Sequence, residues 1–410
     1  MLKGIKFRLY PNQEQKELLE KQFGCSRFVY NWALDYSRWQ YTQNNKTKTN
    51  RYDWSALLPT IKAYLPWIKD ANSQSLQQEL MHLQDAFTRF FKKLGEYPNF
   101  KSKYDKQSFT VPQHFVIGSG LLTIPKIKGI PVIITKDIKN HRSLTISKTK
   151  TGKYFVSVLY ETGIDIPVKP IPEKNKAIGI DLGLKHFAII STGEKKDNPK
   201  FYQKAQKQLR RLQKSLSRKK KDSSNRAKAK QRVALRHERT ANQRSDFLHQ
   251  FTYELTCKNQ GVNTICVENL NVKGMIQNHN LSKSIADVGW GEFFRQLQYK
   301  CEWYAMNLLE CGRFDATSQI CSNCGWKNTN LKLSDRFWEC DVCNCKHDRD
   351  INAAKNIVDF AFKKLYREDT RDFKPLDTEA LARVNIIASE PTVEKPRNRK
   401  ELGSFKPLGA

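Results

Sequence analysis

The chain has 410 residues, enough for two or three domains with cores of their own, and no apolar run of about 18 residues that could span a membrane. With 72 Lys and Arg against 41 Asp and Glu, its formal net charge is +31. Such an excess predicts a polyanionic partner, because neutralised phosphates release condensed counterions. A membrane surface would instead require one basic amphipathic helix, whereas this charge is spread along the whole chain, so nucleic acid is favoured and no membrane contact is expected.

The first part of the chain predicts a small β-barrel interrupted by helices. GIKFRLYPN has alternating apolar residues and reads as a strand that ends in a turn. Helical periodicity follows over residues 13–23 and, after a break at Gly24, over about 26–41, and a third apolar stripe covers residues 76–90. From Phe109 to Tyr160 the pattern changes to strands, with KTGK at residues 150–153 as a hairpin tip.

A second domain is expected to begin near Lys176, after a linker rich in proline. Its opening sequence, AIGIDLGLKHFAIIS, predicts a buried strand with Asp181 at its end and a tight turn into a second strand. Ribonuclease-H-like folds present their first metal-binding carboxylate on such a hairpin. Many solvated turns also contain D-x-G, so this motif alone is compatible with a metal-binding Asp181 and with a purely structural one.

Residues 204–239 form a dense basic segment with 15 Lys and Arg, opposed only by Asp222 and Glu238. Its apolar stripe predicts two helices around the loop KKKDSSN. A charge run is usually a solvated surface, but charge of one sign this dense repels itself without an anion, so we expect contact with phosphate backbones. The residues selected for this contact are Arg210, Arg211, Lys214, Arg218, Lys219 and Lys220.

Two more acidic residues stand at the ends of predicted elements. VNTICVENLNVKGM reads as a buried strand with Glu268 at its polar end, which is a costly place for a carboxylate unless it is paired or bound to a metal. Asp350 begins an apolar-periodic helix. Between them, residues 289–311 predict one long helix with Tyr304 and Leu308 in the core, followed by a short strand over residues 313–319.

Asp181, Glu268 and Asp350 together predict a metal-dependent phosphodiester-cleaving site. Three acids in one pocket repel one another unless divalent cations hold them. Mg²⁺ suits such a site, because it takes oxygen ligands and keeps water and substrate phosphate in its shell. In the expected arrangement Asp181 bridges two ions, Glu268 binds one and Asp350 the other, so that a water is activated and the leaving 3′ oxygen is stabilised.

A structural zinc site is predicted by four cysteines in the pattern C-x2-C-x15-C-x2-C, namely Cys321, Cys324, Cys340 and Cys343. Two such knuckles complete a closed tetrahedral shell. A disulfide cluster or unrelated buried thiols are the alternative, but the start MLKGIKFRLY lacks the apolar stretch of a signal peptide. Cys345 could replace Cys343, and His347 is a weaker candidate ligand.

In order along the chain, the motifs GIDLGLK, VENL, TSQICSNCG…CDVC and HDRDINAAKNI resemble TnpB, the transposon-encoded RNA-guided DNA endonuclease related to type V CRISPR effectors. FRLYPN, SRFVYNW and DVGWGEFFRQLQYK extend the resemblance over nearly the whole chain. It implies that Asp181, Glu268 and Asp350 are a RuvC-type triad. Asp350 is preferred to Asp348 because the family's acid precedes x-N-A-A.

The resemblance also implies partners: a guide RNA from the transposon end and target double-stranded DNA beside a short motif that the protein reads. Tyr52, Ser73, Gln77 and Thr110 fall roughly where the family contacts that motif. The protein is expected to act as a monomer with its guide, in the cytoplasm at the nucleoid of a prokaryotic host.

The expected fold class is α/β plus β-barrel, with a ribonuclease-H-like RuvC domain that carries a zinc ribbon. The expected boundaries are 1–12 for the first strand of the wedge barrel, 13–105 for the helical recognition insert, 106–172 for the rest of the barrel, 173–316 for the first part of the nuclease domain, 317–347 for the ribbon, 348–370 for the last part of the nuclease domain, and 371–410 for a disordered tail.

Two other functions are compatible with parts of this pattern. A structure-selective resolvase without a guide would not need the helical insert, the barrel or the ribbon. A zinc-containing accessory or repressor of transposition would gain nothing from three acids beside phosphates. The sequence shows no second nuclease cassette of the HNH type, so one RuvC site is expected to cut both strands in turn.

Overall fold

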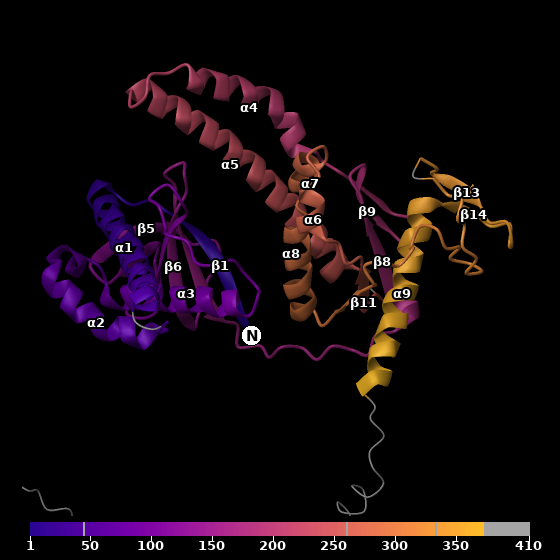
Figure 1. Ribbon diagram of the computed structural model, residues 1–410, viewed down its shortest axis with the longest axis horizontal. Helices are drawn as coiled ribbons and strands as arrows, with labels where there is room; N and C mark the ends of the chain where they lie inside the picture. The colour runs from indigo at the N-terminus through magenta and orange to yellow at the C-terminus, as the bar shows by residue number, and fades with distance from the viewer. Residues whose placement is uncertain (44–45, 260, 333, 373–410) are drawn as a thin grey trace, which may run out of the picture.

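The computed structural model describes residues 1–43, 46–259, 261–332 and 334–372. They form two lobes, one from β1 to β7 and one from β8 to α9, joined by an extended linker (Figure 1). No helix in these ranges is long and apolar enough to cross a membrane. The predicted disordered tail lies outside the described residues, except that residues 371 and 372 form the end of α9 (Arg349–Asp372).

The first lobe is built on a seven-stranded antiparallel sheet in the order β2-β6-β7-β1-β5-β4-β3. Strands from both halves of the sheet contribute to one hydrophobic core, including Phe7, Phe109 and Leu122, so the sheet curls around it. No ladder between described residues joins β2 to β3, and the predicted barrel is therefore a curled sheet that stays open. The strands are β1 (Leu2–Leu9), β2 (Gln107–Val111), β3 (Val116–Gly118), β4 (Leu121–Ile124), β5 (Ile127–Ile133), β6 (His141–Lys148) and β7 (Tyr154–Glu161).

The helices of this lobe lie between β1 and β2, where an insert was predicted. They are α1 (Gln13–Gln43), α2 (Arg51–Tyr64), the 3-10 helix η1 (Pro66–Asp70) and α3 (Ser73–Phe91). The predicted break at Gly24 is wrong, because α1 is one helix of 31 residues. A glycine in a helix interior costs about 1 kcal/mol relative to alanine. Fully burying one large apolar side chain contributes about 1.5–3 kcal/mol, and α1 buries Phe23 and Val29 on either side of Gly24.

The second lobe contains a five-stranded sheet in the order β10-β9-β8-β11-β12. Strand β9 pairs antiparallel with both β8 and β10, whereas β11 runs parallel to both β8 and β12. This order and mixture of directions is that of the ribonuclease-H-like fold, as predicted. The strands are β8 (Ala177–Leu182), β9 (His186–Ile190), β10 (Lys195–Asp197), β11 (Thr264–Val267) and β12 (Asn307–Glu310).

The long helix predicted over residues 289–311 is wrong in its second half. Helix α8 (Trp290–Trp303) ends just before Tyr304, which is 39% exposed, and Ala305 has a φ of +54°. The chain then forms β12 beside β11, and the backbone groups of β12 form hydrogen bonds with β11 instead of bonds within a helix. The strand predicted for residues 313–319 is absent from this described segment, and β12 takes its place earlier in the chain.

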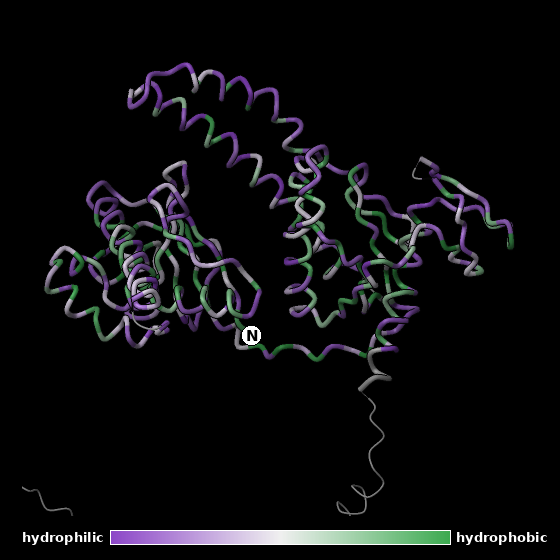
Figure 2. Tube along the Cα trace, viewed as in Figure 1, coloured by the Kyte–Doolittle hydropathy of each residue, from purple (hydrophilic) through white to green (hydrophobic). Residues whose placement is uncertain are grey.

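Two basic helices form the predicted hairpin, α4 (Phe201–Ser217) and α5 (Ser224–Tyr253). The hairpin extends from the second lobe toward the first, and it is largely hydrophilic (Figures 1 and 2). It meets the β6–β7 turn where Glu238 accepts hydrogen bonds from Thr151 (2.9 Å) and Lys153 (2.8 Å). Burial alone raises the pKa of Glu238, but these hydrogen bonds hold it below its ordinary value.

The remaining elements of the second lobe are short. They are the 3-10 helix η2 (Lys174–Lys176), the π-helix η3 (Glu254–Lys258), the helices α6 (Val272–Ile276) and α7 (Ser282–Val288), and the strands β13 (Phe337–Glu339) and β14 (Lys346–Asp348), which form a two-stranded sheet before α9.

Candidate functional site

Asp181 and Glu268 lie side by side at one edge of the second sheet. Strands β8 and β11 are parallel and Ile180 is in register with Val267, so the residue that follows each of them emerges at the same level. Burial raises the pKa of Asp181 well above its ordinary value, and the nearby charges of Glu268 and Asp350 raise it further. Burial also raises the pKa of Glu268, opposed by a hydrogen bond from Thr317, whose hydroxyl lies 3.2 Å from the Glu268 Oε1 atom.

Asp350 reaches this edge because α9 packs directly on β8. A Cβ added to Gly179 would lie 1.9 Å from the Ala354 carbonyl oxygen, so only glycine permits the observed approach. Gly179 stands two residues before Asp181, and Ala354 stands about one helical turn after Asp350. The close packing therefore brings the first turn of α9, with Asp350, toward Asp181.

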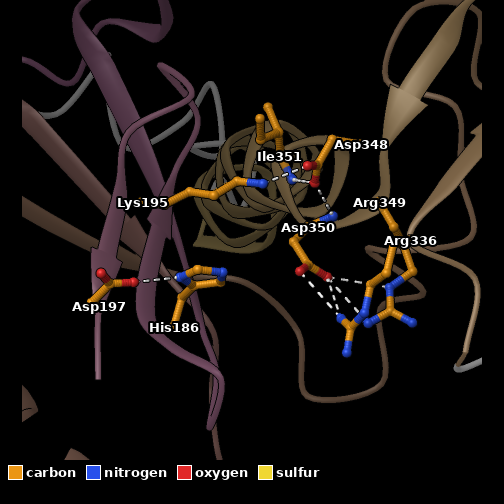
Figure 3. Close-up of polar contacts among 8 residues, drawn as sticks. All are labelled: His186, Lys195, Asp197, Arg336, Asp348, Arg349, Asp350 and Ile351. Carbon is orange, nitrogen blue, oxygen red and sulfur yellow. Dashed lines mark hydrogen bonds and ion pairs between the residues drawn. The ribbon is translucent and has the colours of Figure 1, made fainter. Parts of the chain in front are cut away.

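Asp348 has a different role from Asp350. Its Oδ1 atom accepts hydrogen bonds from the backbone N–H groups of Asp350 (3.0 Å) and Ile351 (3.2 Å), which caps α9 (Figure 3). Lys195 forms an ion pair with its other carboxylate oxygen. The carboxylate of Asp348 is thus engaged in holding the helix, whereas that of Asp350 lies within the electrostatic reach of Asp181.

Two arginines contact Asp350, and reasoning from the sequence missed both. The shortest approaches to its carboxylate are 3.3 Å from Arg336 and 3.1 Å from Arg349 (Figure 3). Arg349 is the neighbour of Asp350 in the motif HDRD and could have been noticed there. Arg336 comes from the segment before β13, and the sequence contains no signal for its approach.

The four predicted cysteines converge in space. The Sγ atoms of Cys321, Cys324, Cys340 and Cys343 all lie within 4.8 Å of one another. The Cys321–Cys343 and Cys324–Cys340 distances of 3.6 and 3.5 Å are far longer than a disulfide bond, so the disulfide alternative is wrong for these residues. Thiolates that each lie about 2.3 Å from one tetrahedral ion are separated by distances of this order, and the cluster therefore fits zinc.

The two alternative ligands lie outside this cluster of four. The His347 Nε2 atom is 3.0 Å from the Cys321 Sγ atom, so the imidazole borders the cluster. Cys345 contributes a backbone carbonyl that accepts from the Cys340 N–H group at 3.0 Å. The geometry supports Cys343 as the fourth member of the cluster.

Two buried asparagines join the cysteine segment to α9. The Asn352 side chain donates to the Ile320 carbonyl at 2.7 Å and accepts from the Ser322 N–H group at 2.9 Å. The Asn356 side chain donates to the carbonyls of Thr317 (2.7 Å) and Ile320 (2.6 Å). The base of the ribbon is therefore fixed to the helix that carries the third acid.

The residues predicted to contact DNA are not all brought together. Ser73 and Gln77 lie one turn apart on α3, both exposed, and Lys62 donates to the Ser73 hydroxyl at 2.8 Å. Tyr52 lies at the other end of α2, ten residues before Lys62, which is about 15 Å along the helix. Thr110 is half-buried in β2, 3.1 Å from the Thr145 hydroxyl.

The six selected basic residues are all exposed on α4 and in the loop that follows it. None forms an ion pair with a described acid. The members of this group are Arg210, Arg211, Lys214, Arg218, Lys219 and Lys220.

Three family models match the chain. One described as "Probable transposase" matches residues 156–279, one described as a helix-turn-helix domain matches 1–46, and a Cas12f1-like TNB domain matches 290–357. The structure of the second region differs from its description, because the described residues of 1–46 contain β1 and one uninterrupted helix.

Curated relatives match over most of their length. A Streptomyces pristinaespiralis protein named "Putative RNA-guided DNA endonuclease" is 37% identical over 371 residues, covering 87% of this chain and 88% of that protein. An Escherichia coli K12 protein named "Putative RNA-guided DNA endonuclease InsQ" is 30% identical, and the match covers 87% of this chain and 92% of that protein. The "TnpB-like protein L770" of Acanthamoeba polyphaga mimivirus is 25% identical, and the match covers 88% of this chain and 74% of that protein.

Among solved structures, a chain of a Cas12f1-sgRNA-target DNA complex aligns over 87% of this chain and 99% of its own, at 15% identity and a TM-score of 0.35. That likeness is too distant to carry an argument. The sequence relatives do carry one, because identities of 37% and 30% extend over nearly the full length of both partners. On that ground the chain belongs to the TnpB family.

Proposed function

We propose that the protein is an RNA-guided DNA endonuclease of an insertion sequence, which hydrolyses both strands of target DNA in one RuvC-type site. The observation that carries this proposal is that Asp181, Glu268 and Asp350 come from three separate elements and lie near enough that the charges of Glu268 and Asp350 raise the pKa of Asp181. Gathering acids beside a phosphate substrate costs free energy unless cations are bound between them. A protein that only binds nucleic acid has no use for that arrangement.

The carboxylates of Asp181, Glu268 and Asp350 are the groups that would hold Mg²⁺. Their oxygen atoms are the ligands that Mg²⁺ prefers. When bound, such ions activate a water and stabilise the leaving 3′ oxygen. The Thr317 hydroxyl orients Glu268, and Arg336 with Arg349 orients Asp350.

The cysteine cluster is proposed to hold a structural zinc ion. A site with four thiolates has no open position for a water or a substrate, so its role is to fold the ribbon. We assign the ribbon to residues 317–347, between the parts of the nuclease domain at 173–316 and 348–370. The first lobe is proposed to be the wedge barrel with its recognition insert at 13–105.

The partners follow from the charge and the family. The basic hairpin of α4 and α5 is proposed to bind phosphate backbones. A short DNA motif is proposed to contact Ser73 and Gln77 of α3 and Thr110 of β2, with Tyr52 on a separate part of the helical insert. The working form is proposed to be one protein with one guide RNA, at the nucleoid of a prokaryotic host.

The central test replaces Asp181. Asp181→Ala should abolish plasmid cleavage by the complex purified with its RNA, while RNA binding stays near that of the wild type. Asp197→Ala is the matched control, because Asp197 is an exposed acid of the same sheet that contacts His186. If Asp181→Ala loses RNA binding and cleavage to the same extent, Asp181 is structural and the assignment fails.

Two further observations separate the alternatives. RNA that co-purifies with protein expressed beside its native flanking DNA should be one species, with a constant structured part and a 3′ segment that matches sequence beyond the element. A random mixture of cellular RNA would favour a resolvase or an accessory protein. A cleavage time course should show nicked plasmid before linear plasmid, and one strand left permanently intact would contradict a single site that cuts both.

A further inference from the structure

Helix α1 borders an open groove in the first lobe that the proposed function does not use. Its volume is about 690 Å³, which is in the range of sites for small ligands. Phe28 and Trp32 lie on α1 four residues apart, Trp67 comes from η1, and Phe100 comes from the segment after α3. The groove is thus walled by aromatic side chains from three separate segments.

These aromatic side chains are incompletely covered by the protein. Trp67 and Phe100 are each 46% exposed, and the Phe28 and Trp67 rings meet edge to face with centroids 4.9 Å apart. More aromatic side chains follow along α1. The rings of Trp32 and Tyr36 stack with their centroids 6.0 Å apart, and Trp39 is 55% exposed. Side chains needed only for the core would be turned inward, as Trp54 of α2 is.

Gly24 leaves open space on the side of α1 that faces this groove. A glycine in a helix interior is unfavourable relative to alanine by about 1 kcal/mol. Gly179 has a packing reason to be glycine, because a Cβ there would collide with the Ala354 carbonyl. A Cβ at Gly24 would meet no atom within 4 Å, although Gly24 lines the groove. The space that the missing side chain leaves is therefore available to a ligand.

Two arginines flank the groove, and neither forms an ion pair with any acid in the described ranges. Arg27 lines the groove and donates to the Gln107 side chain at 2.8 Å. The Arg38 guanidinium lies 4.6 Å from the centre of the Phe100 ring. Asp35 also lines the groove, so a phosphate is better placed at the Arg27 end. Aromatic faces beside unpaired cations are the features by which proteins bind single-stranded nucleic acid.

We propose that this groove binds unpaired bases of single-stranded DNA, with the bases stacked on Trp67 and Phe100 and a phosphate near Arg27. Gly24 allows the strand to approach the helix backbone. Stacking on a protein side chain selects unpaired bases, because the faces of bases within a duplex are covered by the neighbouring base pairs. The choice of DNA rests on the proposed function, because pairing of a guide with one DNA strand displaces the other.

The test measures binding of a fluorescent dT15 oligonucleotide to the full-length protein by anisotropy at several salt concentrations. Trp67→Ala and Phe100→Ala should each weaken binding about 5- to 150-fold, as expected for the loss of one stacked base. The slope of log Kd against log salt should stay unchanged, because both substitutions leave the cations that meet phosphates in place. Trp67→Phe should restore most of the affinity.

Gly24→Ala is the more specific variant, because it removes no side chain. It should melt at the same or a higher temperature than the wild type and still bind dT15 at least fivefold more weakly. Tyr64→Ala is the matched control for an exposed aromatic outside the groove, since Tyr64 is 82% exposed, and it should bind as the wild type does.

Wild-type affinity in both Gly24→Ala and Trp67→Ala would overturn the proposal. A loss confined to rU15 would assign the groove to RNA and overturn the choice of DNA. A change of protein association state in these variants, with dT15 affinity unaltered, would identify a protein interface instead. No cleavage is measured, so an inactive nuclease site leaves these results interpretable.

Discussion

Gly179 offers a direct test of how the third acid is positioned. In Gly179→Ala the new Cβ would stand 1.9 Å from the Ala354 carbonyl oxygen and 3.0 Å from the Val358 Cγ2 atom, whereas ordinary contact begins near 3.4 Å. Helix α9 and strand β8 must therefore separate by about 1.5 Å. The added methyl should lower the free energy of unfolding by about 1–3 kcal/mol, as overpacking does in other cores.

The larger effect is expected in catalysis. Asp350 moves with the first turn of α9, and a displacement of about 1 Å at a reacting centre can cost on the order of 100-fold in rate. Guided plasmid cleavage, measured well below the melting temperature, should fall by that factor while RNA binding is retained. Gly4→Ala is the control, because a Cβ on that strand glycine meets nothing within 4 Å. Unchanged cleavage by Gly179→Ala would refute the reasoning.

Three other predictions concern the ribbon, the basic hairpin and the contact between the lobes. Cys321→Ser should contain no zinc when measured by elemental analysis, and its ribbon should unfold, because binding of structural zinc contributes on the order of 10 kcal/mol to folding. The control Cys257→Ser, at an exposed cysteine outside the cluster, should keep its zinc. Replacing the basic residues 218–220 with glutamine should reduce the slope of log K for RNA against log salt by about 0.7–0.9 for each phosphate that is no longer neutralised, and an unchanged slope would place the RNA elsewhere on the protein. Glu238→Gln should lower the free energy of unfolding by about 1 kcal/mol at pH 7. Because the folded-state pKa of Glu238 is depressed, the difference in melting temperature between the variant and the wild type should shrink as the pH falls below 4.5. A difference that stays constant with pH would show that the ion pair with Lys153 contributes nothing.

The features predicted correctly from sequence are those encoded by local spacing. Strand β1 was identified by alternation, because every second side chain faces the core. Asp181 and Glu268 were placed at strand ends because each directly follows a buried apolar run. The cysteine knuckles depend on two short turns, which spacing also records.

The errors arose where contacts distant in sequence decide the local structure. The sequence pattern predicts a helix end at Gly24, but burial of side chains on both sides of it continues the helix. Residues 304–310 have an apolar pattern that suits a helix or a buried strand, and the free edge of β11 selects the strand. Arg336 meets Asp350 only because the ribbon folds back on α9, which no local pattern records.

The attachment of the ribbon has a consequence for how this family can change. Asn352 and Asn356 hold both Thr317 and Ile320 against α9, so the loop leaves and rejoins the domain at nearly one point. A segment anchored at its base can grow, shrink or exchange its distal portion as long as that base is kept. An insertion around residues 327–332, or a nucleic-acid-binding module grafted there, would leave the proposed catalytic carboxylates undisturbed only if Arg336, which follows in the same segment, also kept its contact with Asp350.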